Sequence, residues 1–294
     1  MKKLASVVGV AIYILSANTA FASSSNQNST TCANGLVREI PTRRAKAPAG
    51  SDVMEQVLNL SGSERDSVVT AQVLSGNVPS FLRNLIPVTF TGELADGQAA
   101  NVTICVTPDY LAVGNDRDFV RIPMGLPAAA EIADEFGFFL PTTKMVDAIY
   151  SQAGIRLAPS PMKPTSQMSS TGYLLTHNDT VDGQLAPLGN DLDALTAGQK
   201  KDLVLSVRLR SKPGRVAIYG WHRTNGVPIQ PLSTVHGALY ADYSHGVRLV
   251  SETAYVNGRA VPLADIMQDP RLAQIVSSEG PINNARGLQA SLYR

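Results

Sequence analysis

Apolar residues in the first half of this chain recur first at helical spacing and then in strand-like alternation. Spacings of three and four residues predict helices over 51–58, 64–74, 127–136 and 142–153. Alternation on both sides of Asp96-Gly97 predicts a hairpin made of 87–94 and 101–106. A short strand is expected at 119–122, and Pro141 separates the last two helices.

The last third of the chain is richer in strand patterns. Alternating apolar residues predict strands over 201–209, 215–221 and 237–250. Asn257-Gly258 predicts a tight hairpin turn within 254–261. One or two short helices are expected over 262–276.

Residues 159–198 are rich in Pro, Ser, Thr, Gly and Asn and show no clear period. A segment of this length predicts a long functional or mobile loop, in which His177 is expected to be solvated. Helices and strands are grouped along the chain and do not alternate. The pattern therefore predicts an α+β fold, a single domain with a mainly antiparallel sheet and a helix pair in the middle of the chain.

The first 22 residues have the three regions of a secretory signal peptide. Two lysines precede an apolar run over 4–15, and small residues flank a cleavage site after Ala22. Residues 23–50 are polar and poor in large apolar side chains, which predicts a flexible, extended arm. We expect the single domain to occupy residues 51–294.

Charge and hydropathy exclude two classes of partner. The chain has 25 Lys and Arg against 24 Asp and Glu, and loss of the signal peptide would change its net charge from +1 to −1. A near-neutral chain has no long-range field that gathers nucleic acid. No apolar run after residue 22 approaches the length of a membrane span. We expect a secreted or periplasmic protein without nucleic-acid binding or membrane insertion.

Cys32 and Cys105 are the only cysteines. Export into an oxidising compartment and an even cysteine count predict a disulfide between them. The competing hypothesis, a nucleophilic Cys105, is weaker because the residue lies in an apolar strand pattern, where thiols are usually inert.

Three of the four histidines fall within residues 220–250, together with the only tryptophan, Trp221. Histidine titrates near neutral pH, and a core strand needs few such side chains. The segment therefore predicts a general acid–base site. Its expected catalytic residues are His222, His236, Tyr240, Asp242, His245 and Arg248.

His245 is the principal candidate. Its small neighbours let the backbone bend, and Asp242 is close enough across a turn to accept an imidazole N–H and set the tautomer. Arg248 is expected to orient Asp242. His236 and His245 lie an odd number of residues apart, so an ideal strand separates them and only a bulge within 241–246 would bring them together.

Other interpretations of the same segment stay open. A serine nucleophile, Ser233 or Ser244, lacks a G-x-S-x-G elbow. A zinc site could use His236, Asp242 and His245, although there is no H-E-x-x-H motif, and the sequence leaves the cofactor open. Histidines and tyrosines can also satisfy one another structurally across a sheet.

Three blocks together resemble those of a group of exported bacterial proteins. They are PDYLAVG at 108–114, LPTTKMVDAIY at 140–150, and the segment at 220–250. The resemblance implies one continuous domain. It implies no activity, cofactor or catalytic residue.

The sequence thus predicts an exported hydrolase or lyase that acts on an extracellular or cell-envelope polymer, or on a small extracellular substrate. The alternative is a non-catalytic secreted binding or envelope-interaction protein that presents Trp221 and the tyrosines as an exposed stacking platform. A zinc-dependent hydrolase that uses the same histidines is a second alternative. The sequence leaves the oligomeric state open.

Overall fold

Strand β2 (Ala99–Val106) organises the larger sheet of the molecule. It pairs antiparallel with β1 along its whole length and with β12 and β13 on its other side. Its side chains alternate between exposed and buried and become buried at the end, over 104–106. In the described part of the chain this sheet has six strands. The other five are β1 (Ile86–Glu93), β5 (Phe138–Phe139), β12 (Val250–Ser251), β13 (Thr253–Val256) and β14 (Arg259–Pro262).

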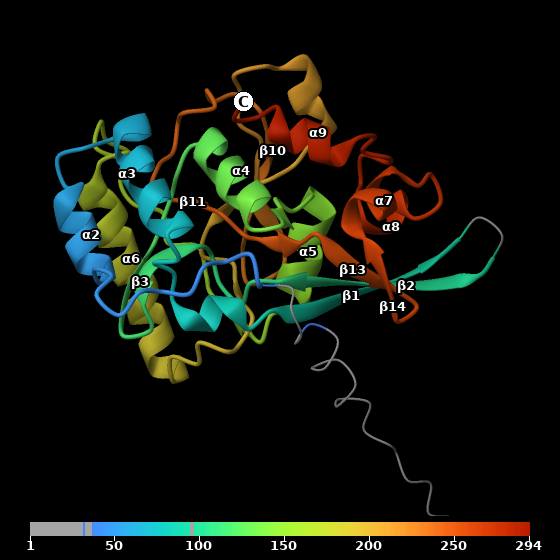
Figure 1. Cartoon of the computed structure of the whole chain (residues 1–294), viewed down its shortest axis with the longest axis horizontal. Helices are drawn as coiled ribbons and strands as arrows, with labels where there is room; N and C mark the ends of the chain where they lie inside the picture. The colour runs from blue at the N-terminus through green and yellow to red at the C-terminus, as the bar shows by residue number, and fades with distance from the viewer. Residues whose placement is uncertain (1–31, 33–36, 95–96) are drawn as a thin grey trace, which may run out of the picture.

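This computed structural model describes residues 32, 37–94 and 97–294. The predicted signal peptide at 1–22, residues 23–31 and 33–36 of the predicted arm, and turn residues 95–96 lie outside them. The described part is one α+β domain with mainly antiparallel sheets (Figure 1), as the grouped pattern predicts. The hairpin β1–β2 and the β13–β14 hairpin around Asn257-Gly258 are both confirmed.

A second, four-stranded sheet carries most of the histidine-rich segment. Its order is β10-β9-β8-β11, with β8 and β11 parallel. The strands are β8 (Lys201–Leu203), β9 (Ile218–His222), β10 (Pro228–Ser233) and β11 (His245–Gly246). Two further pairs complete the strands of the described residues: β3 (Ala112–Asn115) with β4 (Asp118–Arg121), and β6 (Ile155–Arg156) with β7 (Thr196–Ala197).

Two strand predictions in this region are wrong in extent. The strand expected over 201–209 ends at Leu203 and is followed by the 3₁₀ turn η4 (Val207–Ser211), whose first N–H groups are capped by Ser206. The strand expected over 237–250 is a loop with two short strands that join different sheets. Local side-chain bonds of Asp242 replace ladder bonds there.

Helices cover the sheets and form one end of the molecule. In the described residues they are α2 (Gly50–Gln56), α3 (Gly62–Leu74), α4 (Leu126–Glu135), α5 (Thr143–Gln152), α6 (Thr171–Leu185), α7 (Leu263–Gln268), α8 (Ala273–Val276) and α9 (Ala285–Ala290), with 3₁₀ turns η2 (Ser80–Arg83) and η3 (Ala186–Leu188). The four helices predicted before residue 153 are confirmed within a few residues. Thr142 caps α5 by accepting a hydrogen bond from the Met145 N–H at 3.2 Å.

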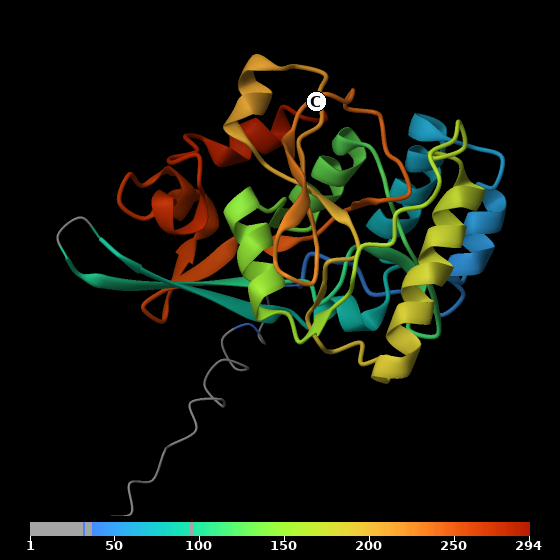
Figure 2. The ribbon, with the colours of Figure 1, turned by 180° about the vertical axis from the view of Figure 1, so that it is seen from behind.

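Helix α6 occupies the segment for which the sequence predicts a loop without regular structure. Its polar residues obscure the helical period, but Ser170 caps its first turn and Thr171 donates to the carbonyls of Val57 and Leu60 at 3.0 Å. These bonds hold α6 beside α2, and both ribbon views show the two helices together with α3 at one end of the molecule (Figures 1 and 2).

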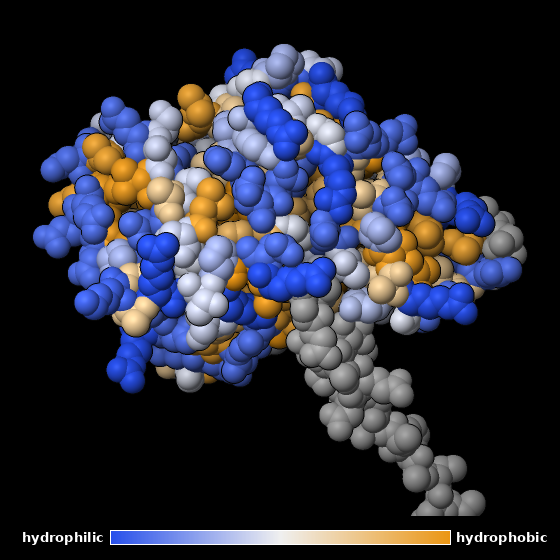
Figure 3. Space-filling view, viewed as in Figure 1, coloured by the Kyte–Doolittle hydropathy of each residue, from blue (hydrophilic) through white to orange (hydrophobic). Residues whose placement is uncertain are grey.

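The face in Figure 3 is mixed, with apolar side chains at several places, among them the end formed by α2 and α3 and the opposite side near β13 and α7. Leu58, just after α2, is 48% exposed. Within residues 37–94 and 97–294, no helix combines the length and apolar character that a membrane crossing requires.

A disulfide joins Cys32 to Cys105 near the end of β2, as the sequence predicts. Both cysteines are buried. The described part of the predicted arm, 37–49, has no helix or strand and is held to the domain by side-chain bonds. Arg43, for example, donates to the Gly114 carbonyl at 2.9 Å.

Replacing both cysteines with alanine should lower the free energy of unfolding by about 2–5 kcal/mol, because the disulfide closes a loop of 73 residues. Urea unfolding of the variant and the wild type measures the difference. Two free thiols in the untreated protein, detected by mass spectrometry, would contradict the assignment.

Candidate functional site

The structure brings three of the predicted site residues into one ring cluster. The His236 ring stacks on Tyr240 with centroids 4.4 Å apart. Tyr240 in turn meets the His245 ring edge to face at 5.8 Å. The irregular loop between residues 236 and 245 thus brings both histidines into contact with one tyrosine, which an ideal strand would not do.

Asp242 does not orient His245, contrary to the prediction. Its Oδ1 accepts hydrogen bonds from the N–H of Ser244 at 2.8 Å and its hydroxyl at 2.5 Å, and its Oδ2 accepts from Tyr240 at 3.1 Å. The backbone turn is closed by a hydrogen bond from the His245 N–H to the Asp242 carbonyl at 3.1 Å. His245 is fully buried, and neither ring nitrogen has a hydrogen-bond partner among the described residues. Burial lowers the pKa of His245 to about 4, against the opposing effect of Asp242.

Arg248 does not orient Asp242 either. Its guanidinium donates to the carbonyls of Thr107 and Thr196 at 2.8 and 2.6 Å and lies over the Tyr110 ring at 4.3 Å. The side chain is fully buried. Arg248 therefore connects the backbone at Thr107 to that at Thr196, and it does not have the predicted role of orienting Asp242.

A buried Lys200–His177 pair is the part of this region that the sequence did not predict. His177 lies on α6 and is fully buried, so the expectation of a solvated loop histidine is wrong. The Lys200 ammonium lies 3.0 Å from His177 Nδ1 and donates to the Tyr243 carbonyl at 2.7 Å. Its pKa is lowered to about 7 by burial and then by Arg121, while Asp109 opposes the shift. We call His177, Lys200, Asp242, Tyr243 and His245 the buried histidine cluster.

Residues 158–170 lie over the buried histidine cluster. Tyr243 accepts a hydrogen bond from the Met162 N–H at 2.8 Å, and its own N–H donates to the Met168 carbonyl at 3.1 Å. Trp221 and Tyr243 are 5% and 3% exposed. They are therefore packed beneath this segment and do not form the exposed stacking platform that a binding protein would present.

The polar residues around Arg121 form an ion network. Arg121 donates to Asp109 and Asp182, each at 2.7 Å, and only Asp182 is substantially exposed. Gln199 donates to the other Asp109 oxygen at 2.8 Å. Burial alone would lower the pKa of Arg121, but the two carboxylates raise it, so the guanidinium stays charged. Arg121 on β4 is thereby linked to Asp182 on α6.

His222 stands apart from the other predicted site residues and faces α5. Its Nε2 lies 2.8 Å from Asp147 Oδ1, and its ring stacks on Tyr150 at 4.6 Å. The Tyr219 hydroxyl donates to the same Asp147 oxygen at 2.9 Å. Figure 2 shows α5 beside the β9–β10 hairpin that carries His222.

The backbone of β9 directs Trp221 to the buried histidine cluster and its neighbour His222 to Asp147. Trp221 has a positive φ of 55°, which is strained for a residue with a large side chain. Trp221 joins the apolar packing around Tyr243, while its neighbour His222 contacts Asp147. Strain of this kind clusters at functional sites, so it supports a functional role for this strand.

A cavity of about 510 Å³ opens at His222. Its lining residues are Asp147, Tyr150, Ser151, Arg156, Tyr219, His222, Thr224, Asn225, Gly226 and Pro228, and we call it the His222 cavity. His222 is the only one of the predicted site residues in its wall. The Asp147 side chain is 50% exposed, whereas that of His222 is 3% exposed. A substrate in this cavity would therefore meet Asp147, with His222 behind it.

Burial, followed by the adjacent Asp147 carboxylate, raises the pKa of Tyr219 well above its ordinary value. Tyr219 thus stays protonated at neutral pH, and its hydroxyl donates a hydrogen bond to Asp147. Asp202 lies on the inner side of this centre, where burial raises its pKa to about 6 and Arg248 opposes the shift. The sequence by itself does not identify Asp147, Tyr150 or Tyr219 as site residues. Asp147 and Tyr150 lie in a segment whose apolar spacing is already explained by an amphipathic helix, so nothing marks them as functional.

No group of three or more His, Cys, Asp or Glu side chains in the described part of the chain is arranged to hold a metal ion. The zinc alternative therefore has no ligand set there. Comparison with protein-family models, with curated proteins and with solved structures found no match. The resemblance of the three sequence blocks stays a prediction, and function must be argued from the site itself.

The neutral state of the two buried histidines predicts acid sensitivity. Their pKa values are about 3 for His177 and about 4 for His245, below the unfolded value of 6.5. Between pH 6.5 and 4 the unfolded chain binds protons that the folded chain does not. The free energy of unfolding should therefore fall as the pH drops through this window, and proton uptake by the buried Asp202, whose pKa is about 6, offsets part of the fall below pH 6.

Urea unfolding at a series of pH values measures this dependence. A His245→Leu variant should show a shallower slope, because one of the two titrating groups is gone. His236→Leu is the matched control, since His236 is exposed and should keep the wild-type slope. Equal slopes for wild type and His245→Leu would contradict the burial argument.

Proposed function

We propose that this chain is an exported hydrolase or lyase that acts on an extracellular or cell-envelope polymer and that its reaction centre is the His222 cavity. The observation that carries the proposal is the exposed Asp147 carboxylate, which accepts hydrogen bonds from His222 and Tyr219 on the wall of an open cavity. A general base must lie within hydrogen-bond reach of the proton it takes, and a carboxylate exposed to an open cavity meets this requirement.

Asp147 is the proposed catalytic base. Both donors use its Oδ1, and no described residue donates to Oδ2, so this oxygen is available to a substrate or a water molecule. His222 is a positioning residue, because it is buried behind the carboxylate and stacks on Tyr150. Its role thus differs from the proton transfer that the sequence predicts for it.

Tyr219 is the proposed acid. In hydrolysis, Asp147 takes a proton from water, the water oxygen bonds to the scissile carbon, and the bond from that carbon to the leaving oxygen breaks. Tyr219 gives its proton to the leaving oxygen, and the proton on Asp147 then returns to Tyr219. In elimination, Asp147 takes a proton from carbon, a double bond forms, and Tyr219 again protonates the leaving oxygen. Arg156 lines the cavity and would neutralise an acidic group of the substrate.

The cavity wall supports a polar substrate with flat faces. Tyr219 offers a half-buried ring, and Asn225 and Thr224 offer hydrogen bonds. This combination suits sugar units, in which apolar faces alternate with hydroxyl groups. Export rests on the predicted signal peptide, and the disulfide is consistent with it. If the protein is instead a non-catalytic binding protein, the same cavity would bind the ligand and no proton would be transferred.

Asp147→Asn should lower turnover by roughly 10²–10⁴-fold, because the amide cannot accept the proton. The assay incubates the purified protein with peptidoglycan and with acidic polysaccharides. It follows reducing ends for hydrolysis and ultraviolet absorbance of the unsaturated product for elimination. Asp179→Asn is the matched control, an exposed carboxylate on α6 outside the cavity.

The melting temperatures of the two variants should match that of the wild type within a few degrees. Full turnover of Asp147→Asn would exclude the carboxylate as the base. Saccharide binding to the wild type without any product would favour the binding-protein alternative and overturn the enzyme proposal.

A further inference from the structure

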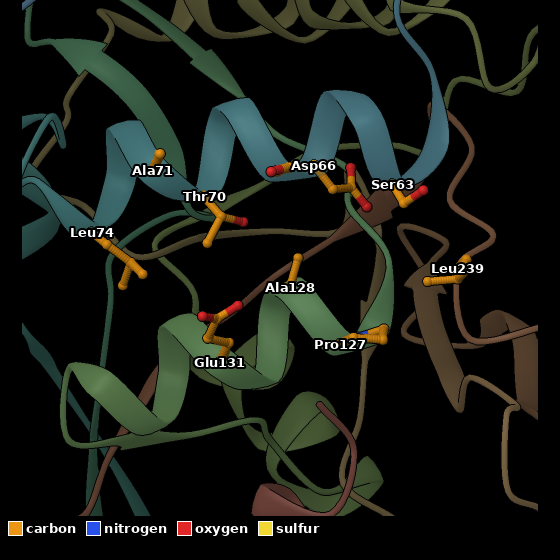
Figure 4. Close-up of a pocket in the computed structure, with 10 residues that line it drawn as sticks. Ser63, Asp66, Thr70, Ala71, Leu74, Pro127, Ala128, Glu131 and Leu239 are labelled. Carbon is orange, nitrogen blue, oxygen red and sulfur yellow. The ribbon is translucent and has the colours of Figure 1, made fainter. Parts of the chain in front are cut away.

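A second cavity lies between helices α3 and α4, on elements that take no part in the His222 cavity (Figures 1 and 4). Its volume is about 390 Å³. Figure 4 shows Asp66 and Thr70 on the α3 side and Glu131 and Ala128 reaching up from α4 into the same gap. Leu239 borders it from the loop after β10.

Two side chains that line this cavity each have a buried oxygen without a hydrogen-bond partner among the described residues. Asp66 is 5% exposed, and its Oδ2 accepts from the Gly125 N–H at 2.7 Å, but its Oδ1 accepts no hydrogen bond from the described residues. Thr70, one helical turn on, is 8% exposed, and its Oγ1 is equally unpaired there. Unpaired buried oxygens are costly, about 1–3 kcal/mol each, so their convergence on one cavity points to a donor from outside the chain.

The charges at this cavity favour a cation. Glu131 faces Asp66 and Thr70 from α4. Arg65 is the nearest counter-charge, with Nε 3.8 Å from Asp66 Oδ1, but it is fully buried, does not line the cavity and donates to the Ser169 carbonyl at 2.7 Å. The two carboxylates therefore outnumber the single guanidinium.

The remainder of the wall is apolar. Ala71 and Leu74 continue the α3 side, Pro127 and Ala128 the α4 side, and Leu239 is 57% exposed at the edge. Such a wall contacts methylene groups well and offers them no hydrogen bond.

We propose that this cavity binds a primary alkylammonium group, with the nitrogen donating to Asp66, Thr70 and Glu131 and the carbon stem packed against the apolar wall. Three acceptors on two facing helices match the three donors of a compact ammonium. A guanidinium presents its donors in one plane and suits a single bidentate carboxylate better. The same group can come from a free diamine or from a lysine side chain of a peptide or protein.

Isothermal titration calorimetry on the full exported chain distinguishes the sources. The probes are the diamine cadaverine and Nα-acetyl-lysine amide, with pentanol and Nα-acetyl-norleucine amide as neutral matches. Binding of cadaverine alone identifies a free-amine site, and binding of the lysine amide identifies a side-chain site. Either result supports the proposal. No binding of either amine, or equal binding of the neutral matches, overturns it.

Variants connect the binding to the cavity. Asp66→Asn should weaken amine binding at least about tenfold, because a charge-assisted bond is lost. Since Asp66 also accepts from Gly125, Glu131→Gln on the more exposed helix provides a second test that does not depend on a buried bond and should also weaken binding. Glu135→Gln, exposed on the same helix outside the cavity, is the control.

Asp147→Asn should leave amine binding unchanged, so failure of the proposed enzyme function and failure of this site are distinguishable. Unchanged amine affinity in folded Glu131→Gln and Asp66→Asn would place the binding elsewhere and overturn the assignment.

Discussion

Burial of the Lys200 ammonium constrains how the elements pack around the buried histidine cluster and the His222 cavity. A buried cation needs acceptors, and Lys200 finds them in His177 Nδ1 and the Tyr243 carbonyl. These contacts tie α6 to the loop before β11 and so hold the Asp242–His245 turn in place. Two residues on, Asp202 accepts a hydrogen bond from Tyr110 at 2.9 Å, which extends the same buried polar layer towards His222.

This polar layer separates structural charges from charges that a ligand can reach. His177, Lys200 and His245 are fully buried, and burial holds the pKa of each below its ordinary value. Asp147 is half exposed. A group that touches substrate must be accessible, so the proton transfer proposed here belongs to Asp147, and the buried histidine cluster supports the strand that carries His222.

The local elements of this fold are visible in the sequence because short-range physics determines them. The β13–β14 hairpin follows from Asn257-Gly258, and the α5 start follows from Thr142 as a cap. The Cys32–Cys105 disulfide follows from compartment and count. Helix α6 was not predicted, because its polar residues hide its period and its stability comes from tertiary contacts such as those of Thr171.

The sequence by itself determined the α+β class, the hairpins, the disulfide and the gathering of histidines in one segment. Only the tertiary structure decided what those histidines touch. Proton chemistry depends on which side chains meet across the fold, and Asp147 lies 75 residues from His222 along the chain. Spacing along a chain predicts neighbours within one helix or strand, whereas the pairing of α5 with β9 depends on how whole elements pack.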